Sequence, residues 1–283
     1  MKAVVSSSEI IHYYSSSQWL YNYFWSPYAH GMHVGFWNQK THTVDEAVEN
    51  ENASVLAYAN VKATDTVLDA GCGIGGTSLY FGQKTRATIV GITIVESQVA
   101  QATSLSKSAD LHPRVSFQIA DFTKLPYANN SFDVVIGIES ICHAYPKSAF
   151  LAEAYRVLKP SGRLVIADGY MKHPPKNDKD RKSRDLFCRS FALSELIDVH
   201  GMERNINKVG FRKIIKIDKT LEVLAGAAAL YRKSHILQSL IPFVKLLPFA
   251  WARSIVRNAA AARASMGLLS SGVGWYGIFT AIK

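Results

Sequence analysis

Apolar and polar positions along this chain repeat with two different periods. Short apolar runs bounded by Gly, Asn, Asp or Ser are typical of strands, and seven are present, at about 65–70, 87–93, 115–120, 132–138, 163–168, 211–217 and 275–282. Four intervening segments have helical spacing, around 75–84, 96–108, 147–158 and 193–209. This alternation predicts an α/β fold with a mostly parallel, seven-stranded sheet that carries helices on both faces.

Two segments depart from this alternation. Residues 172–189, KHPPKNDKDRKSRDLFCR, contain prolines and many charges, which predicts an exposed loop that opens an inserted lid. Residues 236–251, ILQSLIPFVKLLPFAW, are strongly apolar, but their prolines and lysine leave them too short and too broken to span a bilayer. For this segment a buried lid ranks first, a wall for a greasy substrate second, and a membrane-surface segment third.

Length and composition set the scale of the fold. A chain of 283 residues that is 48% hydrophobic buries a sizeable core and favours one elaborated α/β domain. Strands and helices alternate only from about residue 65 onward, so we predict an N-terminal helical cap at residues 1–60 and a second unit at residues 61–283. The predicted lid insertion of that second unit falls at about 171–200 and 220–272.

The net charge of +10 comes from one half of the chain. Residues 1–150 contain 9 Lys and Arg against 12 Asp and Glu, whereas residues 151–283 contain 23 against 10. Such local basicity suits an anionic membrane face, an anionic substrate such as a diphosphate, or a plain solvated surface. A nucleic-acid partner is the least favoured, because no RNA-binding or DNA-binding motif accompanies the charge.

Cysteine usage and the N-terminus bear on the compartment. Cys72, Cys142 and Cys188 make no disulfide framework and lie in predicted motifs or helices, which favours a reducing setting. The first residues lack the long apolar stretch of a secretory signal. We therefore expect a cytoplasmic protein, and we leave peripheral membrane contact and homo-oligomer formation open.

The most informative motif is VLDAGCGIGG at residues 67–76. Gly71, Gly73 and Gly76 fit G-x-G-x-x-G, which after a buried strand and before a helix predicts a turn where a ligand contacts the backbone. Asp69 stands two places ahead of the first glycine. A carboxylate at this point is unfavourable for a pyrophosphate, and it suits a ligand that carries an ammonium group.

The next strands test the dinucleotide interpretation. A dinucleotide site requires an acidic residue about 20 residues after the glycines, but the second strand ends in Thr93. The third strand ends at Asp121 and Phe122, a pair that accepts from an adenine amino group and packs on its face. Polar residues follow five of the strands: Asp69, Thr93, Asp121, Glu139 and Asp168. In a parallel sheet, such positions converge on one crevice.

The glycine turn with its preceding acid and the later Asp-Phe pair resembles the class I S-adenosylmethionine-dependent methyltransferases, over about residues 67–168. The sequence GITIVESQ at residues 91–98 resembles more narrowly the sterol C-methyltransferases and tocopherol methyltransferases, in which threonine and glutamine replace the usual ribose-binding acid. The resemblance implies a Rossmann-like fold and S-adenosyl-L-methionine as the cofactor. It implies these cofactor-binding residues: Asp69, Gly71, Cys72, Gly73, Gly75, Thr93, Gln98, Asp121, Phe122 and Glu139.

A second stretch, ESICHAYP at residues 139–146, resembles the E-[SA]-x-x-H-x-x-[PD] segment of the same relatives and of some sugar O-methyltransferases. The resemblance marks Glu139 and His143 as catalytic candidates. His143 suits a general base toward a hydroxyl because imidazole titrates near working pH, and a hydrogen-bonded wall residue is the alternative. Glu139 suits contact with the cofactor or stabilisation of a carbocation.

Aromatic residues gather near both ends of the chain. Residues 12–37 resemble the aromatic N-terminal segment of sterol C-methyltransferases, and GWYGIF in the last strand also resembles these relatives. Aromatic faces stabilise a sulfonium or a carbocation by up to about 2 kcal/mol each. Most of these rings are expected to pack a cap helix, with Tyr14 and Trp37 facing the site as catalytic candidates. The expected substrate pocket comprises Tyr14, Trp37, His143, Trp275 and Tyr276. No consistent histidine spacing predicts a metal site.

Together these motifs predict a methyltransferase that acts on a small hydrophobic acceptor. The first choice is C-methylation of an isoprenoid alkene, in a sterol, a polyprenyl chain or a prenyl diphosphate, because a carbocation gives the rings and Glu139 a purpose. The runner-up is O- or N-methylation of a specialised metabolite with His143 as base. A non-catalytic interaction protein that kept the cofactor fold and a dinucleotide oxidoreductase are more distant alternatives.

Overall fold

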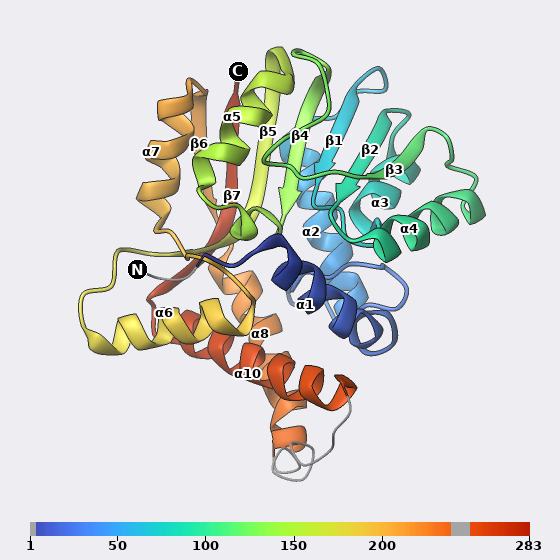
Figure 1. Cartoon of the computed structure of the whole chain (residues 1–283). Helices are drawn as coiled ribbons and strands as arrows, with labels where there is room; N and C mark the ends of the chain where they lie inside the picture. Colours follow the sequence, from blue (N-terminus) through green and yellow to red (C-terminus); the bar gives the residue numbers. More distant parts are fainter. Residues whose placement is uncertain (1–3, 239–249) are drawn as a thin grey trace.

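A computed structural model describes residues 4–238 and 250–283 of the chain. Seven strands form one sheet in the order β3-β2-β1-β4-β5-β7-β6, and β7 is antiparallel to both of its neighbours (Figure 1). The strands are β1 (Thr66–Ala70), β2 (Thr88–Thr93), β3 (Val115–Ile119), β4 (Phe132–Ile138), β5 (Leu158–Met171), β6 (Arg212–Asp218) and β7 (Gly274–Ile282). The predicted seven-stranded, mostly parallel α/β sheet is therefore confirmed.

Helices cover both faces of the sheet because successive strand residues point to opposite sides. In β1, Val67 packs with α2 (Val44–Ala59) and α3 (Gly76–Lys84), whereas Leu68 packs with α5 (Lys147–Val157) and α7 (Val199–Val209). Helix α4 (Glu96–Ser108) lies against β2 and β3. Strands buried on both faces explain why their sequences read as continuous apolar runs.

A second group of helices lies beyond the ends of the strands toward which the β1 to β4 arrows point (Figure 1). It comprises α1 (Ser7–Leu20), the π-helical turn η1 (Tyr21–Trp25), α6 (Asp178–Ser190), α8 (Thr220–Gln238) and α10 (Ala250–Ser270). Helix α10 packs against α1, α6 and α8. The short 3-10 turn η2 (Ile141–His143) follows β4 on the same side. These elements cover the edge of the sheet where the strand-end residues gather.

Two local expectations were wrong. Residues 178–190 form α6 rather than an exposed loop, because Asn177 caps the helix by accepting a hydrogen bond from the Asp180 amide and because buried Cys188 packs in a cluster with Leu268. The helix expected at 193–209 begins only at Val199, where the Asp198 carboxylate caps it by accepting from the Gly201 amide.

Other predictions keep their status. Most of the apolar stretch 236–251 lies outside the described residues, so its role as buried lid, substrate wall or membrane-surface segment stays a prediction. The division at residues 60 and 61 also stays a prediction, although Val55 and Ala59 of α2 pack on the sheet face. Among the described helices, none has the length and hydropathy needed to cross a membrane.

Candidate active site

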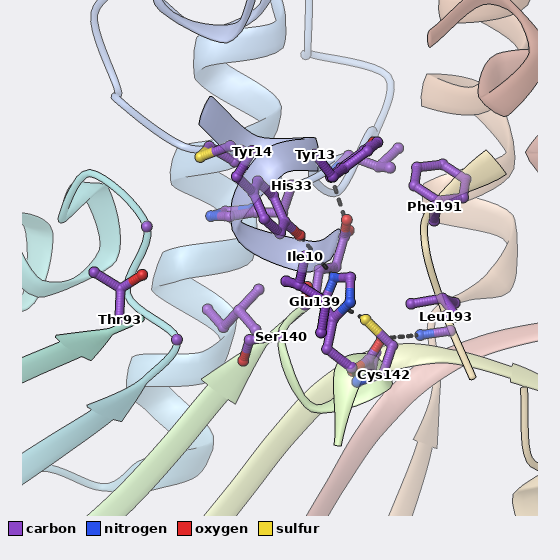
Figure 2. A pocket seen from close by; sticks show the side chains of 18 of the residues that line it. Ile10, Tyr13, Tyr14, His33, Thr93, Glu139, Ser140, Cys142, Phe191 and Leu193 are labelled. Carbon is purple, nitrogen blue, oxygen red and sulfur yellow. Dashed lines mark hydrogen bonds between the residues drawn. The ribbon is translucent and has the colours of Figure 1, made fainter. Parts of the chain in front are cut away.

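A cavity opens at the carboxyl ends of the parallel strands, beneath α1. Its wall combines α1, residues 30–34, the glycine turn after β1, the ends of β2 to β5, the segment after α6, and parts of α8, α10 and β7. Figure 2 shows Tyr13 and Tyr14 of α1 on one side, with Glu139 directly after β4 and Cys142 of η2 on the other. Every expected site residue lines this cavity except Gly75 and Trp37.

The glycine turn is shaped for close approach of a ligand. Gly71 and Gly73 have φ values of +87° and +54°, in the left-handed region that favours glycine. A Cβ at Gly71 would lie 2.4 Å from the Cβ of Ser140, and one at Gly73 would lie 3.2 Å from the Met32 sulfur. Side chains at these positions would fill the space over the turn, so the backbone remains accessible from the cavity.

Gly75 serves the turn and helix–strand packing. It lies outside the cavity lining, caps the start of α3 with φ +91°, and leaves room for the Phe117 ring, which a Cβ would approach to 2.6 Å. The expected contact of Gly75 with the cofactor stays a prediction.

Asp69 presents a buried carboxylate to the cavity at the end of β1. The Ser78 hydroxyl donates to it at 2.6 Å, and burial raises the pKa of Asp69 to about 6. A buried carboxylate in a cavity favours a cationic ligand, because an opposite charge offsets its loss of hydration.

Thr93 and Gln98 form one hydrogen-bonded unit at the end of β2. The Thr93 hydroxyl donates to the Gln98 side-chain oxygen at 2.7 Å, and the Gln98 amide donates to Gln18 of α1 at 3.0 Å. Gln18 in turn donates to Asn22 at 2.8 Å, and Asn22 donates to Gln101 at 3.2 Å. This ladder of side-chain amides attaches α1 to α4 directly beside the cavity.

Asp121 and Phe122 lie together at the end of β3, as predicted. The Asp121 carboxylate accepts from the backbone amide and the hydroxyl of Thr123, both at 2.7 Å. The Phe122 ring stands edge-on to Phe150 and also lies near Gly71. An exposed carboxylate beside a fixed ring provides one acceptor and one flat apolar face.

Glu139 is held in a strained backbone conformation after β4, with φ +45°. Its Oε1 accepts from the Val34 amide at 2.9 Å and lies 3.1 Å from the Tyr276 hydroxyl. Burial, and then the nearby Glu51 carboxylate, raise the pKa of Glu139 to about 8. In the ligand-free protein this side chain is therefore mostly neutral at pH 7.

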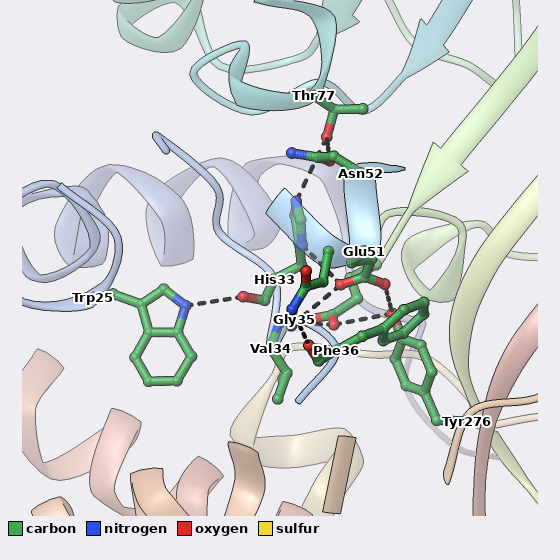
Figure 3. A network of polar contacts seen from close by, with 11 residues as sticks. Trp25, His33, Val34, Gly35, Phe36, Glu51, Asn52, Thr77 and Tyr276 are labelled. Atoms are coloured by element: carbon green, nitrogen blue, oxygen red, sulfur yellow. Dashed lines mark hydrogen bonds and ion pairs between the residues drawn. The ribbon is translucent and has the colours of Figure 1, made fainter. Parts of the chain in front are cut away.

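The sequence analysis missed Glu51, which lies fully buried in α2 behind the cavity wall. Its carboxylate contacts His33, Gly35 and Tyr276 (Figure 3). One signal was available, since Glu51 and Asn52 interrupt the buried stripe of α2 that Ala47, Val48 and Val55 otherwise form. Buried polar residues in an apolar helix face usually have partners, but sequence alone did not identify them.

His143 contacts Tyr14 directly at the cavity wall. The Tyr14 hydroxyl and His143 Nε2 lie 2.8 Å apart, and both side chains line the cavity. Burial, with a further contribution from the Lys147 ammonium, lowers the pKa of His143 to about 4. The imidazole is thus neutral at pH 7 and able to accept a hydrogen bond from a hydroxyl.

The remaining aromatic candidates fall into two groups, those that line the cavity and one that does not. Trp275 and Tyr276 line the cavity from β7, where Trp275 packs against Tyr170. Trp37 does not line it: a Cβ at Gly226 of α8 would lie 2.6 Å from its indole nitrogen. Trp37 therefore packs against α8 outside the cavity lining, and its expected role in the site stays a prediction. Across the described parts of the chain, no group of three His, Cys, Asp or Glu side chains is arranged to hold a metal ion.

Comparisons with known proteins agree with this geometry. A family model described as a methyltransferase domain matches residues 68–166. O-methyltransferase resE from Aspergillus sclerotiorum is 34% identical over 223 residues, which cover 70% of this chain and 84% of that protein. Sterol 24-C-methyltransferase ERG6 from Saccharomyces cerevisiae is 26% identical over 242 residues, covering 77% of this chain and 63% of that protein.

A solved structure extends the likeness to the whole fold. The crystal structure of the [4+2]-cyclase SpnF superposes with a TM-score of 0.80 at 23% sequence identity, covering 98% of this chain and 97% of that one. At this identity the likeness concerns the fold alone. The chain spans 50% to 63% of the length of three other curated relatives, so their complete activities do not transfer directly.

The residues around the cavity fit the cofactor that this family uses. Two glycines keep the turn open to a ligand, and buried carboxylates favour a positive charge. Asp121 and the Thr93–Gln98 pair offer polar atoms for the amino and hydroxyl groups of a nucleoside, although these individual assignments stay predictions. From its sequence relatives and its fold, the chain belongs to the class I S-adenosylmethionine-dependent methyltransferases, enzymes whose cofactor is S-adenosylmethionine.

Proposed function

We propose that this enzyme methylates a hydroxyl oxygen of a hydrophobic small molecule, with His143 as the general base. The contact between Tyr14 and His143 at the cavity wall carries the proposal. S-adenosylmethionine supplies an activated methyl group when bound. The chain's own residues then have to orient the acceptor, exclude water and receive one proton.

The Tyr14 hydroxyl marks a position from which an acceptor hydroxyl is able to reach His143. A neutral imidazole accepts the proton as the oxygen is methylated, and burial makes the resulting imidazolium unfavourable by itself. Asp168 contributes a buried carboxylate to the same cavity. The reaction keeps the positive charge of the site constant, because the sulfonium loses its charge as the His143 imidazole becomes an imidazolium.

The cavity wall indicates an uncharged, apolar acceptor. Side chains beyond the glycine turn are largely aromatic or aliphatic, among them Ile10, Tyr170, Phe191, Leu193 and Trp275. Within the described residues, neither Lys nor Arg belongs to the lining. A diphosphate would bring its negative charges close to Asp69, Glu139 and Asp168, so the anionic acceptor considered from the sequence is disfavoured inside this cavity.

C-methylation of an isoprenoid alkene, the first choice from the sequence, becomes the second candidate. The rings of Tyr13, Tyr14 and Trp275 around the cavity favour it, because aromatic faces stabilise a carbocation. The sequence likeness to sterol 24-C-methyltransferase ERG6 also supports it. The likeness to O-methyltransferase resE, which covers 84% of that protein, supports the hydroxyl acceptor instead.

A labelled methyl group separates the two reactions. The purified protein is incubated with S-adenosylmethionine carrying a 13C methyl and with panels of hydroxylated polyketides, sterols and isoprenoid alcohols. Carbon–proton correlation spectra then show whether the label is attached to oxygen or to carbon. A methyl ether supports the proposal, whereas a new carbon–carbon bond selects the second candidate.

His143→Ala then tests the base on any acceptor found. We expect kcat to fall by about 10²–10⁴-fold while the Kd for the cofactor stays within a small factor, because the imidazole acts on the acceptor. His12→Ala is the matched control, since His12 is an exposed histidine of α1 that does not line the cavity. Equal turnover in the two variants would contradict the role of His143.

A further inference from the structure

Glu51 receives three hydrogen bonds although it does not touch the cavity. His33 Nδ1 lies 2.8 Å and the Gly35 amide 3.2 Å from Oε2, and the Tyr276 hydroxyl lies 2.6 Å from Oε1 (Figure 3). Burial opposes a charge on His33, but the carboxylates around it, Glu51 foremost, raise the pKa of His33 overall. Three donors make the Glu51 carboxyl the hydrogen-bond acceptor at the centre of this network.

Tyr276 connects Glu51 to Glu139 through a hydroxyl that has one proton. The hydroxyl lies 2.6 Å from Glu51 and 3.1 Å from Glu139, and one proton serves only one of these two contacts at a time. With the shorter bond made to Glu51, the Glu139 carboxyl needs a proton of its own to bond the Tyr276 oxygen. Hydrogen-bond geometry alone therefore favours a protonated Glu139 in the ligand-free protein.

Most of the groups around Glu139 favour its protonated form. Burial and the carboxylates of Glu51 from α2 and Asp168 from β5 raise the pKa of Glu139, whereas His33, which is paired with Glu51, and the Val34 amide lower it. Asp69 from β1 lines the same cavity. Tyr14 from α1 and Tyr276 from β7 face Glu139 as neutral hydroxyls, because burial raises the pKa of both. A cationic ligand would reverse this balance and favour the ionised form of Glu139.

We propose that Glu51 is a positioning residue that, through Tyr276, keeps Glu139 protonated until a sulfonium cation occupies the cavity. Glu139 then releases its proton to solvent, so one proton leaves the site for each positive charge that enters. With the uncharged thioether of S-adenosylhomocysteine, Glu139 keeps its proton. This proposal depends on the cofactor of the family and not on which acceptor is methylated.

The exchange of a proton for a cation makes affinity depend on pH in one direction. Below pH 8 the affinity for S-adenosylmethionine is expected to rise about tenfold per pH unit, because one proton has to leave before the charged cofactor binds well. The affinity for S-adenosylhomocysteine is expected to stay nearly constant over the same range. The protein therefore distinguishes substrate from product better as the pH rises toward 8.

Calorimetry measures this exchange without any acceptor or turnover. Titrations of each ligand at pH 6.5 to 9, in two buffers with different ionisation enthalpies, give the number of protons released per ligand bound. We expect close to one proton for S-adenosylmethionine at pH 7 and close to none for S-adenosylhomocysteine. Equal release with the two ligands would overturn the proposal.

Two substitutions are expected to move the pH profile to lower pH. In Glu51→Gln the side-chain amide donates to Tyr276, which frees the phenolic proton for Glu139 and removes a like charge, so the rise in affinity moves to lower pH. In Tyr276→Phe the phenolic oxygen that accepts from protonated Glu139 is lost, so the protonated form is less favoured and the rise also moves to lower pH. A purely structural role would weaken the binding of S-adenosylmethionine and of S-adenosylhomocysteine together. It would not change the difference between the pH profiles of the two ligands.

Glu49→Gln is the matched control, because Glu49 is an exposed glutamate on the same helix. It is expected to reproduce the wild-type profile. Thermal unfolding verifies that each variant is folded before titration, and Tyr276→Phe alone still tests the connection if Glu51→Gln does not fold. A wild-type profile in either folded network variant would overturn the assigned role of the Glu51–Tyr276 pair.

Discussion

Glu139 is the residue at which burial and ionisation conflict most directly. Its pKa is raised to about 8, above the ordinary value of 4.5, so the folded state holds a proton that the unfolded state has already lost. The contribution to stability is complete below pH 4.5 and is lost as the pH rises toward 8. We predict that Glu139→Gln unfolds at a higher temperature than the wild type at pH 8 to 9.

Thermal unfolding between pH 5 and pH 9 measures this difference. The gap between Glu139→Gln and the wild type is expected to widen as the pH rises, because the amide has no proton to lose. Glu49→Gln, on the exposed side of α2, is expected to follow the wild type throughout. Parallel curves for Glu139→Gln and the wild type would contradict a protonated Glu139.

Single residues also show where sequence reasoning stops. Asp69, Thr93 and Glu139 were predictable because the ends of parallel strands meet at one edge, a rule that needs only the strand assignment. Glu51 was not, since its partners His33 and Tyr276 are 18 and 225 positions away and are brought together only by the packing of α2 on the sheet. Long-range contacts of this kind have no local sequence pattern.

At the scale of elements, the turn from β1 into α3 depends on three glycines with positive φ, Gly71, Gly73 and Gly75. We predict that Gly75→Ala lowers the free energy of unfolding by about 1–3 kcal/mol, because a Cβ is strained at φ +91° and would lie 2.6 Å from the Phe117 ring. Urea unfolding measures the loss.

Gly267→Ala provides the opposite case within α10. A Cβ at Gly267 meets nothing within 4 Å and the residue lies inside the helix, so alanine is expected to stabilise the protein by about 0.5–1 kcal/mol. If both variants lose stability equally, the cost lies in the loss of any glycine and not in the turn geometry.

The amide ladder gives α1 a specific attachment at one side of the cavity. Gln18→Ala removes the bonds from Gln98 and to Asn22, so we predict faster amide hydrogen exchange in α1 and a roughly fivefold weaker affinity for the cofactor. Mass-spectrometric exchange, with and without S-adenosylhomocysteine, measures both effects.

Ser16→Ala is the control for α1 itself, because the Ser16 hydroxyl bonds only to the carbonyl of Tyr13 in its own helix. It is expected to exchange like the wild type. Unchanged exchange in Gln18→Ala would show that packing on α10, including the Arg257 guanidinium 4.0 Å from the Tyr13 ring, holds α1 without the ladder.

For the whole molecule, the sheet was predictable and its coverings were only partly so. All seven strands fell within a few residues of their expected positions, because apolar runs flanked by turn residues are strong local signals. Helix α6 was missed, since its dense charge resembles a loop. Trp37 packs on α8 outside the cavity lining, and an aromatic ring that packs and one that binds look alike in sequence. Coverings over a cavity are set by tertiary packing rather than by local pattern.

The basic charge of the second half has one structural location that explains part of it. Strand β6 forms the outer edge of the sheet, pairs with β7, and exposes Arg212, Lys213 and Lys216 beside Ile215, which is 58% exposed. Charged side chains on an edge strand oppose pairing with another molecule. We predict that replacing Arg212 and Lys216 with leucine makes the protein self-associate.

Light scattering at increasing protein concentration measures this association. The matched control replaces Lys179 and Lys182 with leucine, because both are exposed on α6 and the change in charge and hydropathy is the same. A helix has no free row of backbone donors and acceptors, so the control is expected to remain dispersed at concentrations where the β6 variant associates. Equal association of the two variants would mean that net charge alone prevents copies of the protein from associating. The position of the charge on the edge strand would then have no special effect.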